Sequence, residues 1–412
     1  MSHVTERRRD PRSVSLPVLA VLAAVTAITI FGCSSGVGAQ SLSGRSQAGR
    51  HAAQDHARSG RIHHYEYVIP DGALFIYDMD AGQRLVRRVA LPMAKRVRGA
   101  VASPRAHTLY VSYGGDGGSA GSGSLLAYDL LSNHVRWQRH YSYGIDSMAI
   151  SPDGRRIYMP TGELDSSGIW YVLAANDGHV LGTMRGGAGA HNTVTSLNGR
   201  HVYLGGRNSD YLDVADASTD RVVKRIGPLR SGVRPFTING RETLAFTTAT
   251  GFLGFQVSSI VSGRVLYTET FPGYGWNPAS YTASAPSHGI SLSPDEHQLW
   301  VMDAPNSTVH VFDVSVVPHG APRLLANMHL SAPMSGDEQP CAYDCARNGW
   351  IQHSRDGRFV YVGDSGDVID ARTFRVVGYL PALRQTRKML EIDWRNGRPV
   401  ATTSRQGVGY VR

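Results

Sequence analysis

A short pattern of two strands joined by a tight turn recurs along the chain and limits the folds that it can adopt. Its clearest copy, residues 287–314, has an apolar-alternating run before the turn Ser293-Pro294-Asp295 and a β-rich run, 299–302, after it. Period-2 apolar alternation between clusters of Pro, Asp, Asn and Gly is typical of short antiparallel strands. Six further copies share this order of strand, turn and strand: 102–115, 150–162, 196–206, 237–248, 353–364 and 393–404.

The spacing of these copies is that of a propeller blade. Measured between equivalent turn positions, the steps along the chain are 48, 45, 41, 56, 61 and 40 residues. A four-stranded blade takes about 40–50 residues. We therefore predict an all-β, seven-bladed β-propeller of four-stranded antiparallel blades, two of which carry insertions.

The turn itself carries a family resemblance. Copies such as ISPDGRRIYMP (150–160) and HSRDGRFVYVG (353–363) have the form Ser-Pro-Asp-Gly followed by Tyr-Val or a close equivalent. They resemble the YVTN-type β-propeller repeat, which is shared by lactonase-like and other periplasmic or secreted propellers. The resemblance covers roughly residues 65–412. Because the matched residues are turn and core positions, it implies the fold and leaves the function open.

The two ends of the repeat array complement each other. Three strand-like runs, 65–70, 73–80 and 84–91, precede the first full repeat and lack its first strand. The run KMLEIDW (388–394) supplies a first strand at the other end. Pairing of the N- and C-terminal strands in one blade would close the ring and remove exposed sheet edges. We place the propeller domain at residues 62–412.

Residues 1–39 have the pattern of an export signal. Residues 40–61 lack apolar periodicity, so we expect them to form a flexible linker. Four arginines precede an apolar run, 14–31, that is short for a membrane span. Two cleavage sites compete: a lipobox-like Ile30-Phe31-Gly32-Cys33, which would lipidate Cys33, and the small-x-small residues 37–39. We expect a periplasmic or secreted protein, attached to the membrane only through a lipid on Cys33 if that site is used.

The charge of the chain limits the classes of partner that we expect. The formal net charge is +9, but no Lys/Arg-rich helix and no basic-aromatic interleaving accompanies it, so nucleic acid is not an expected partner.

Cys341 and Cys345 are the only cysteines besides Cys33. In an oxidising compartment an even pair predicts a disulfide, whereas a metal pair would need further ligands close by.

One position in each repeat collects polar residues. Counting back five positions from the turn serine or its equivalent gives a column in which four of seven residues are ionisable: Arg98, Asp146, His191 and His288. In a propeller this column opens at one mouth of the central channel. We predict a ligand site there, formed with the neighbouring residues Asn192, Arg234, Trp350 and Arg387. The alternative is that these side chains only solvate a wet channel mouth.

The two longest insertions, 271–289 and 327–350, are expected on the same face and are rich in Tyr, Trp, Pro and Gly. They bring Trp276 and Trp350 to the mouth as candidate ligand-binding residues.

His191, His288 and Asp146 are the candidate catalytic residues. Two imidazoles and a carboxylate suit a divalent metal such as Zn, Cu or Fe(II), held by His191 and His288 near the channel axis. Metal-free acid/base chemistry on a substrate held by arginines is the other interpretation. The cofactor is therefore not specified. Taking the column to be exposed, we expect alanine at either histidine to leave stability nearly unchanged.

Three functions are compatible with this pattern. The first is a cell-envelope protein that binds a small polar or anionic ligand, or a protein partner, at the channel mouth. The second, implied by the resemblance, is a lactonase-like or lyase-type enzyme. The third is a periplasmic electron-transfer or dehydrogenase subunit, similar to the propeller subunits of amine dehydrogenases.

Overall fold

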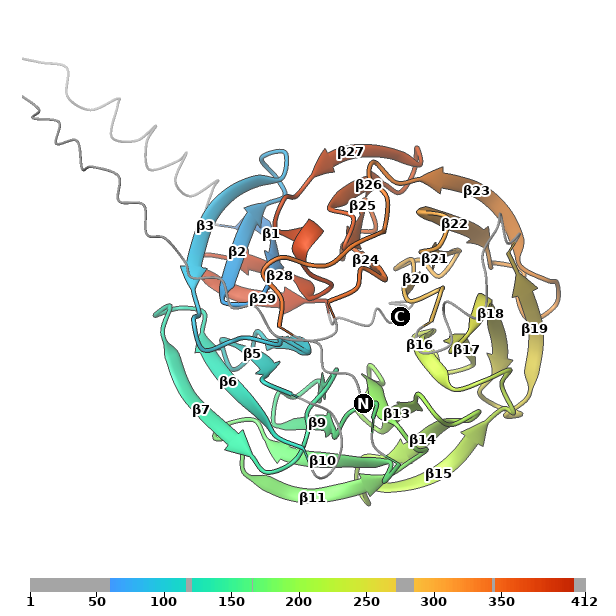
Figure 1. Ribbon diagram of the computed structural model, residues 1–412, viewed down its shortest axis with the longest axis horizontal. Helices are drawn as coiled ribbons and strands as arrows, with labels where there is room; N and C mark the ends of the chain where they lie inside the picture. Colours follow the sequence, from blue (N-terminus) through green and yellow to red (C-terminus); the bar gives the residue numbers. More distant parts are fainter. Residues whose placement is uncertain (1–59, 116–120, 165, 272–284, 343–344, 404–412) are drawn as a thin grey trace, which may run out of the picture. The chain divides into compact units, whose positions relative to one another are not determined.

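The computed structural model describes residues 60–115, 121–164, 166–271, 285–342 and 345–403. These residues form twenty-nine β-strands and one short 3-10 helix, η2 (Leu383–Gln385). The strands make seven antiparallel sheets that surround a central axis as blades (Figure 1). The predicted all-β, seven-bladed propeller is confirmed. No helix within the described ranges has the length and apolar character needed to cross a membrane.

Six blades are built from four consecutive strands that pair in chain order. Blade 1 contains β4 (Gly99–Ser103), β5 (Thr108–Tyr113), β6 (Gly123–Asp129) and β7 (Val135–Tyr141). Blade 2 contains β8 (Ala149–Ile150), β9 (Arg156–Pro160), β10 (Ile169–Ala174) and β11 (Val180–Arg185). Blade 3 contains β12 (Ala190–Thr195), β13 (His201–Gly206), β14 (Leu212–Asp216) and β15 (Arg221–Ile226).

The next three blades repeat the arrangement. Blade 4 contains β16 (Val233–Ile238), β17 (Leu244–Ala249), β18 (Phe252–Ser259) and β19 (Val265–Thr270). Blade 5 contains β20 (Ile290–Leu292), β21 (Gln298–Asp303), β22 (Thr308–Asp313) and β23 (Arg323–His329). Blade 6 contains β24 (Trp350–His353), β25 (Phe359–Gly363), β26 (Asp367–Asp370) and β27 (Arg375–Tyr379).

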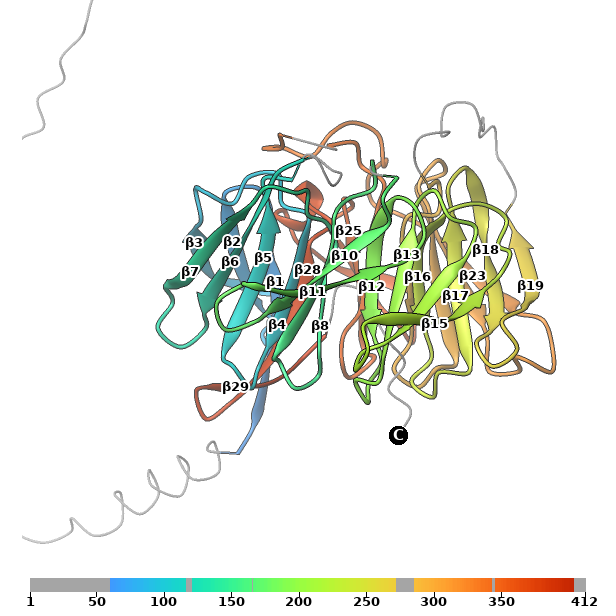
Figure 2. The same cartoon turned by 90° about the horizontal axis from the view of Figure 1, so that it is seen from below.

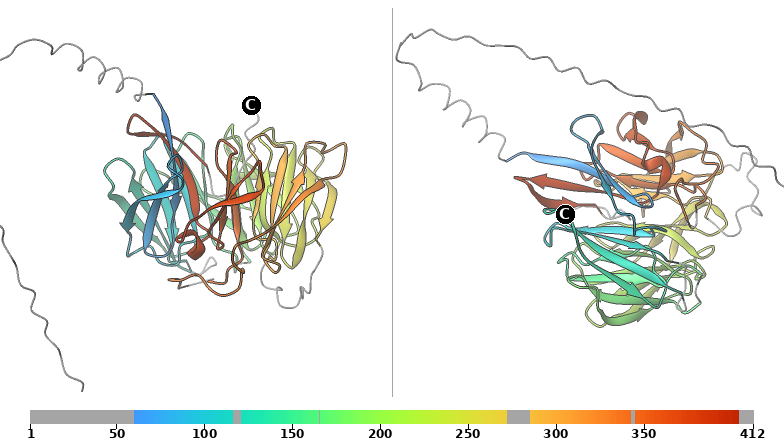
Figure 3. Two further views of the ribbon diagram at one scale, coloured as in Figure 1. Left: turned by 90° about the horizontal axis from the view of Figure 1, so that it is seen from above. Right: turned by 60° about the vertical axis from the view of Figure 1, so that its left-hand side comes forward.

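The closing blade joins the two ends of the array. Along its whole length β28 (Met389–Arg395) pairs with β1 (Ile62–Val68), which is followed by β2 (Ala73–Asp78) and β3 (Arg84–Ala90). Figure 3 shows the blue N-terminal strand beside the red C-terminal strands. The other edge of β28 pairs with β29 (Arg398–Thr402), so this blade has a fifth strand.

The recurring Ser-Pro-Asp-Gly turn has a specific hydrogen-bonding role. In blade 2 the Ser151 hydroxyl donates to Asp153 Oδ1 at 2.6 Å and accepts from the Arg156 amide at 3.0 Å. Gly154 takes a positive φ of 71°, a conformation that glycine adopts without a Cβ clash. The turn therefore satisfies its own polar groups and reverses the chain between the first two strands. Equivalent serine bonds occur at Ser196, Ser293 and Ser354.

Packing between blades forms the core. The strand alternation places apolar side chains on both faces of each blade, where they meet those of the neighbours. Tyr67 and Leu390 of the closing blade, for example, pack with Val111 and Leu126 of blade 1 in one buried cluster. The outermost strands, such as β3, are largely exposed, and β3 carries three arginines. Because every blade repeats one strand order, the residues that begin the inner strands gather at one face of the ring, and the side view in Figure 2 separates this face from the opposite one.

Candidate functional site

The inner strands of blades 1 to 5 bring together the predicted residues Arg98, Asp146, His191, Arg234 and His288. Asp146 joins three blades: its Oδ2 accepts from Arg98 Nη2 at 3.0 Å and from His191 Nδ1 at 2.8 Å. Its side chain is 1% exposed. Burial alone would raise the pKa of Asp146, but the Arg98 guanidinium and the His191 ring hold it well below its ordinary value. Asp146 is therefore an ionised, buried acceptor.

A second carboxylate, Glu163, binds three arginines. It lies in the loop between β9 and β10 and is 4% exposed. Its oxygens lie 3.2 Å from Arg98 Nη2, 3.1 Å from Arg207 Nη1 and 2.8 Å from Arg234 Nη1. Burial favours a higher pKa for Glu163, but Arg234, His191 and Arg98 together lower it below its ordinary value.

Sequence reasoning did not identify Glu163 or Arg207. Both follow the second strand of their blades, β9 and β13, in loops that open on the same face as the column. This shared position in the repeat is the sequence signal that could have identified the two residues.

His288 lies beside this network and is held neutral. Its Nδ1 donates to the Gly349 carbonyl at 3.0 Å, and its ring meets the Trp350 ring edge-on with centroids 5.8 Å apart. Burial, Arg234 and Arg387 lower the pKa of His288 well below its ordinary value. The His191 and His288 rings lie 6.4 Å apart.

Each of the two histidines has one ring nitrogen that receives no hydrogen bond from the part of the chain that the structure describes. Since a carboxylate accepts from His191 Nδ1 and a carbonyl from His288 Nδ1, both of these nitrogens carry protons, and Nε2 of the neutral His288 ring has a lone pair. Both Nε2 atoms are buried and have no hydrogen-bond partner among the described residues, and the same holds for both amide atoms of Asn192. Buried polar atoms are usually satisfied, so such a group indicates a place where a ligand or water can bind.

Arg387 forms the other side of the mouth, together with residues absent from the sequence prediction. Its Nε lies 3.3 Å from Glu338 Oε1 and 3.7 Å from Asp364 Oδ2. Asp364 Oδ2 also accepts from the amides of Asn348 and Gly349. Burial raises the pKa of Glu338 to about 8, with Lys388 opposing and Asp364 adding to the rise. We call the eight residues Arg98, Asp146, Glu163, His191, Arg207, Arg234, His288 and Arg387 the channel-mouth site.

The column is buried, not exposed as the sequence suggested. His191 and His288 are 3% and 2% exposed, because the neighbouring inner strands and Trp350 pack around them. The expectation that alanine at either position would be neutral for stability therefore loses its basis. Removing the partner of a buried hydrogen-bonding group costs about 1–3 kcal/mol. Trp350 is 0% exposed and belongs to strand β24, so it forms the wall of the site rather than part of a covering loop.

Three other predictions, for Trp276, for Cys33 and for a metal at His191 and His288, are not tested by the described residues. Trp276 and Cys33 lie outside the described residues. His191 and His288 do not belong to a three-residue metal cluster: within the described part of the chain, the group whose ligand atoms all lie within 4.8 Å of one another is His64, Glu391 and Asp393. Metal binding at the two mouth histidines remains a prediction.

The predicted disulfide is present. Cys341 and Cys345 are bonded in the connection into β24. Beside the bond, the Glu338 amide donates to the Cys345 carbonyl at 2.8 Å, and Asp337 bridges to Ala346. The disulfide thus closes the segment that places Glu338 against Arg387.

Replacing both Cys341 and Cys345 with serine should have a small effect on global stability. The bridge closes a loop with a sequence separation of only 4, so its entropic contribution is at most about 2 kcal/mol. Urea unfolding measures this difference. A much larger loss, or two free thiols in the unreduced protein, would contradict the assignment of a local staple.

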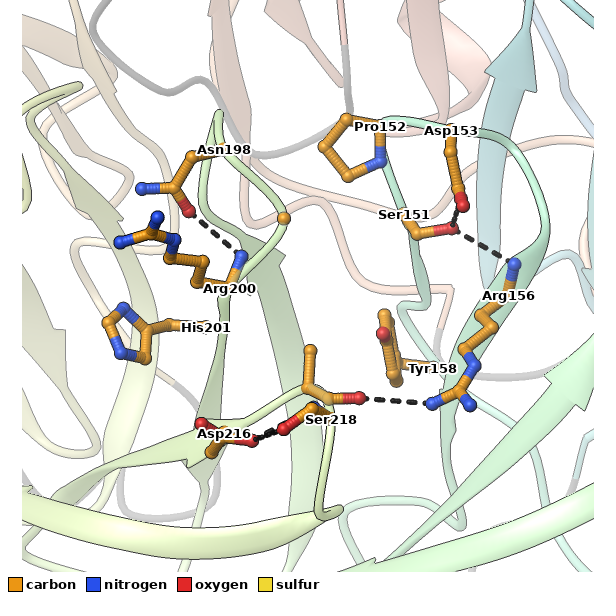
Figure 4. A pocket seen from close by; sticks show the side chains of 12 residues that line it. Ser151, Pro152, Asp153, Arg156, Tyr158, Asn198, Arg200, His201, Asp216 and Ser218 are labelled. Carbon is orange, nitrogen blue, oxygen red and sulfur yellow. Dashed lines mark hydrogen bonds between the residues drawn. The ribbon is translucent and has the colours of Figure 1, made fainter.

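A cavity also lies at the face of the ring opposite the channel-mouth site. It has a volume of about 750 Å³ and separates the turns of blades 2 and 3 (Figure 4). Its polar groups are already engaged: Arg156 Nη1 donates to the Ala217 carbonyl, and Asp216 accepts from Ser218. A similar groove of about 480 Å³ separates blades 1 and 2. Such grooves form because the turns of neighbouring blades are spaced apart around the ring.

Comparison with known proteins supports the fold. No family model and no curated protein matches the chain. Among solved structures, the chain is similar to a chain of Kuenenia stuttgartiensis hydrazine synthase, with a TM-score of 0.50 and 16% sequence identity over 77% of this chain and 88% of that one. The shared feature is the β-propeller. At this identity the likeness concerns the fold alone, and the resemblance to YVTN-type repeats remains a prediction from the turn pattern.

Proposed function

We propose that the channel-mouth site binds a small anionic ligand, with a carboxylate as the expected group. The observation that carries this proposal is a surplus of positive charge beside the buried Nε2 atoms of His191 and His288, which have no hydrogen-bond partner among the described residues. Arg98, Arg207, Arg234, Arg387 and Lys388 supply five cationic side chains. Asp146, Glu163, Asp364 and Glu338 oppose them, and the pKa of Glu338, which burial raises, reduces the negative charge that this group contributes. Guanidinium groups bind carboxylates with two parallel hydrogen bonds.

His288 should couple ligand binding to pH. Arg234 and Arg387 help to lower its pKa in the free protein. An anion that pairs with these guanidinium groups favours the protonated ring and so raises that pKa. Affinity should therefore increase as pH falls below the ordinary histidine value, by at most about tenfold per pH unit for one coupled proton.

The test is a thermal-shift and calorimetry screen with small mono- and dicarboxylates, phosphate and sulfate at pH 5.5 and 7.5. A ligand should stabilise the wild type more at the lower pH and lose this effect in His288→Ala. His353→Ala is the matched control, because His353 is also buried but bonds to Ser291 Oγ away from the channel-mouth site. Equal binding by both variants would contradict the proposal.

An enzyme is the second candidate, favoured by the Asp146–His191 pair. A buried carboxylate that orients an imidazole through Nδ1, leaving Nε2 available, is the arrangement of a general base. Such a base would serve hydrolysis or elimination on the bound ligand. With a ligand identified, His191→Gln should reduce turnover much more than binding, whereas equal loss of both would favour a binding protein.

The basic and apolar N-terminus supports export to the cell envelope as part of the same proposal.

A further inference from the structure

A second cluster of metal-ligating side chains lies at the seam where the ring closes, away from the channel-mouth site. The register of β1 and β28 pairs His64 with Asp393 and Glu66 with Glu391. Residues directly opposite each other, and residues two apart on one strand, point to the same face of a sheet. One face of the seam therefore carries an imidazole and three carboxyl groups from the two ends of the chain.

Three of these groups converge on one point. His64 Nδ1 lies 2.7 Å from Asp393 Oδ1 and 3.1 Å from Glu391 Oε1. Of all the His, Cys, Asp and Glu residues in the described ranges, only these three form a group with every ligand atom within 4.8 Å of the others. Glu391 and Asp393 are buried, with 1% and 6% of their side chains exposed, whereas His64 is 25% exposed. The partly exposed imidazole gives solvent ions access to the buried oxygens.

Arg355 orients both carboxylates. Its Nε donates to Asp393 Oδ2 at 2.9 Å, and its backbone amide donates to Glu391 Oε2 at 2.7 Å. The second oxygen of each carboxylate, Oδ1 and Oε1, is thereby turned toward His64 Nδ1. Hydrogen bonds that hold the outer oxygens of ligating carboxylates are typical of metal centres.

Glu66 provides an independent indication that a cation belongs here. It is 1% exposed, lies opposite Glu391 on the same face, and its Oε1 has no hydrogen-bond partner among the described residues. A buried carboxyl oxygen without a partner is costly, and a nearby divalent ion would compensate it.

We propose that His64 Nδ1, Glu391 Oε1 and Asp393 Oδ1 bind one divalent transition-metal ion, of which Zn²⁺ is the expected type, with Glu66 beside it. The mixture of imidazole nitrogen and carboxylate oxygen suits zinc, manganese or ferrous iron better than calcium or magnesium, which prefer oxygen alone. The ion takes the position of the Nδ1 proton. Because it joins β1 to β28, it acts as a staple across the closure of the ring.

The test uses untagged protein that has been treated with a chelator and then titrated with ZnCl₂, MnCl₂ or CaCl₂. We expect one bound equivalent of zinc by elemental analysis after gel filtration, and a rise in Tm that saturates at that ratio. His64→Ala and Glu391→Gln should each lose both effects, while circular dichroism shows that they remain folded; His64→Gln replaces His64→Ala should that variant fail to fold.

Two further variants locate the ion. His63→Ala removes the adjacent, half-exposed histidine, and His288→Ala alters the channel-mouth site; both should retain the zinc equivalent. Zinc retained by His64→Ala and lost by His288→Ala would move the metal to the mouth and overturn the proposal. Absence of stoichiometric zinc in the wild type, or a preference for calcium, would also overturn it.

Discussion

Deleting residues 389–412 is expected to abolish cooperative unfolding of the propeller. The deletion removes β28 and β29 and leaves β1 with an unpaired edge. It also removes Met389, Leu390 and Ile392, which are all 0% exposed. Truncating one such buried side chain to alanine costs about 2–5 kcal/mol. Losing all three approaches the whole stability of a domain, which is about 5–15 kcal/mol. Urea unfolding followed by fluorescence, with light scattering for aggregation, measures the result.

Two variants separate this effect from simple shortening. Deleting residues 404–412 removes none of the described strands and should preserve a cooperative transition. Leu390→Ala should keep the transition cooperative but lower the free energy of unfolding by about 2–5 kcal/mol. Ring closure through β28 would be contradicted by a 389–412 deletion that unfolds with the wild-type midpoint and cooperativity.

Replacing Glu163 with alanine should be the most damaging single substitution in the channel-mouth site. Glu163 is the common partner of Arg98, Arg207 and Arg234, and its removal takes one ion-pair partner from all three guanidinium groups at once. Breaking a buried ion pair by removing one partner costs about 3–5 kcal/mol. Chemical denaturation of wild type and variant at pH 7 measures the difference. Asp177→Asn, which breaks an exposed pair with His179, is the control and should leave the curve unchanged.

The same variant has a predicted pH dependence. Because the pKa of Glu163 is lowered in the folded protein, its contribution to stability is present above its ordinary value of 4.5 and is lost as pH falls through the lower folded value. Glu163→Ala should therefore lose less stability than the wild type on acidification below pH 4.5. Parallel acid profiles for the two proteins would show that Glu163 does not stabilise the fold as an anion.

The fold could be predicted because its determinants are local. The alternation of apolar residues and the Ser-Pro-Asp-Gly turns act within ten or so residues, and the Ser151 bonds show why that motif reverses the chain. Closure by β1 and β28 followed from complementary gaps in the repeats. The copy at 393–404 also indicates the turn after β28 and the strand β29, but not that β29 is a fifth strand, because β28 alone completes the expected four.

The channel-mouth site was only partly predictable because its contacts join separate blades. Counting from the turns found Asp146 and His191, which come from equivalent positions of blades 2 and 3. Glu163 lies in a loop of variable length, where no fixed count identifies it. The burial of His191 and His288 depends on packing between blades, which a strand pattern does not specify.

The pairing of β1 with β28 also determines the order in which this chain can fold. Blades 1 to 6 each consist of consecutive residues and can form as soon as they leave the ribosome. The contact between His64 and Glu391 joins residues 327 positions apart, so the last blade cannot assemble until nearly the whole chain has been made. Contacts of such sequence separation form slowly. Until then β1 to β3 have no inner strand to pair with, and the free edge of β1 is the part of the nascent protein most open to pairing with another chain.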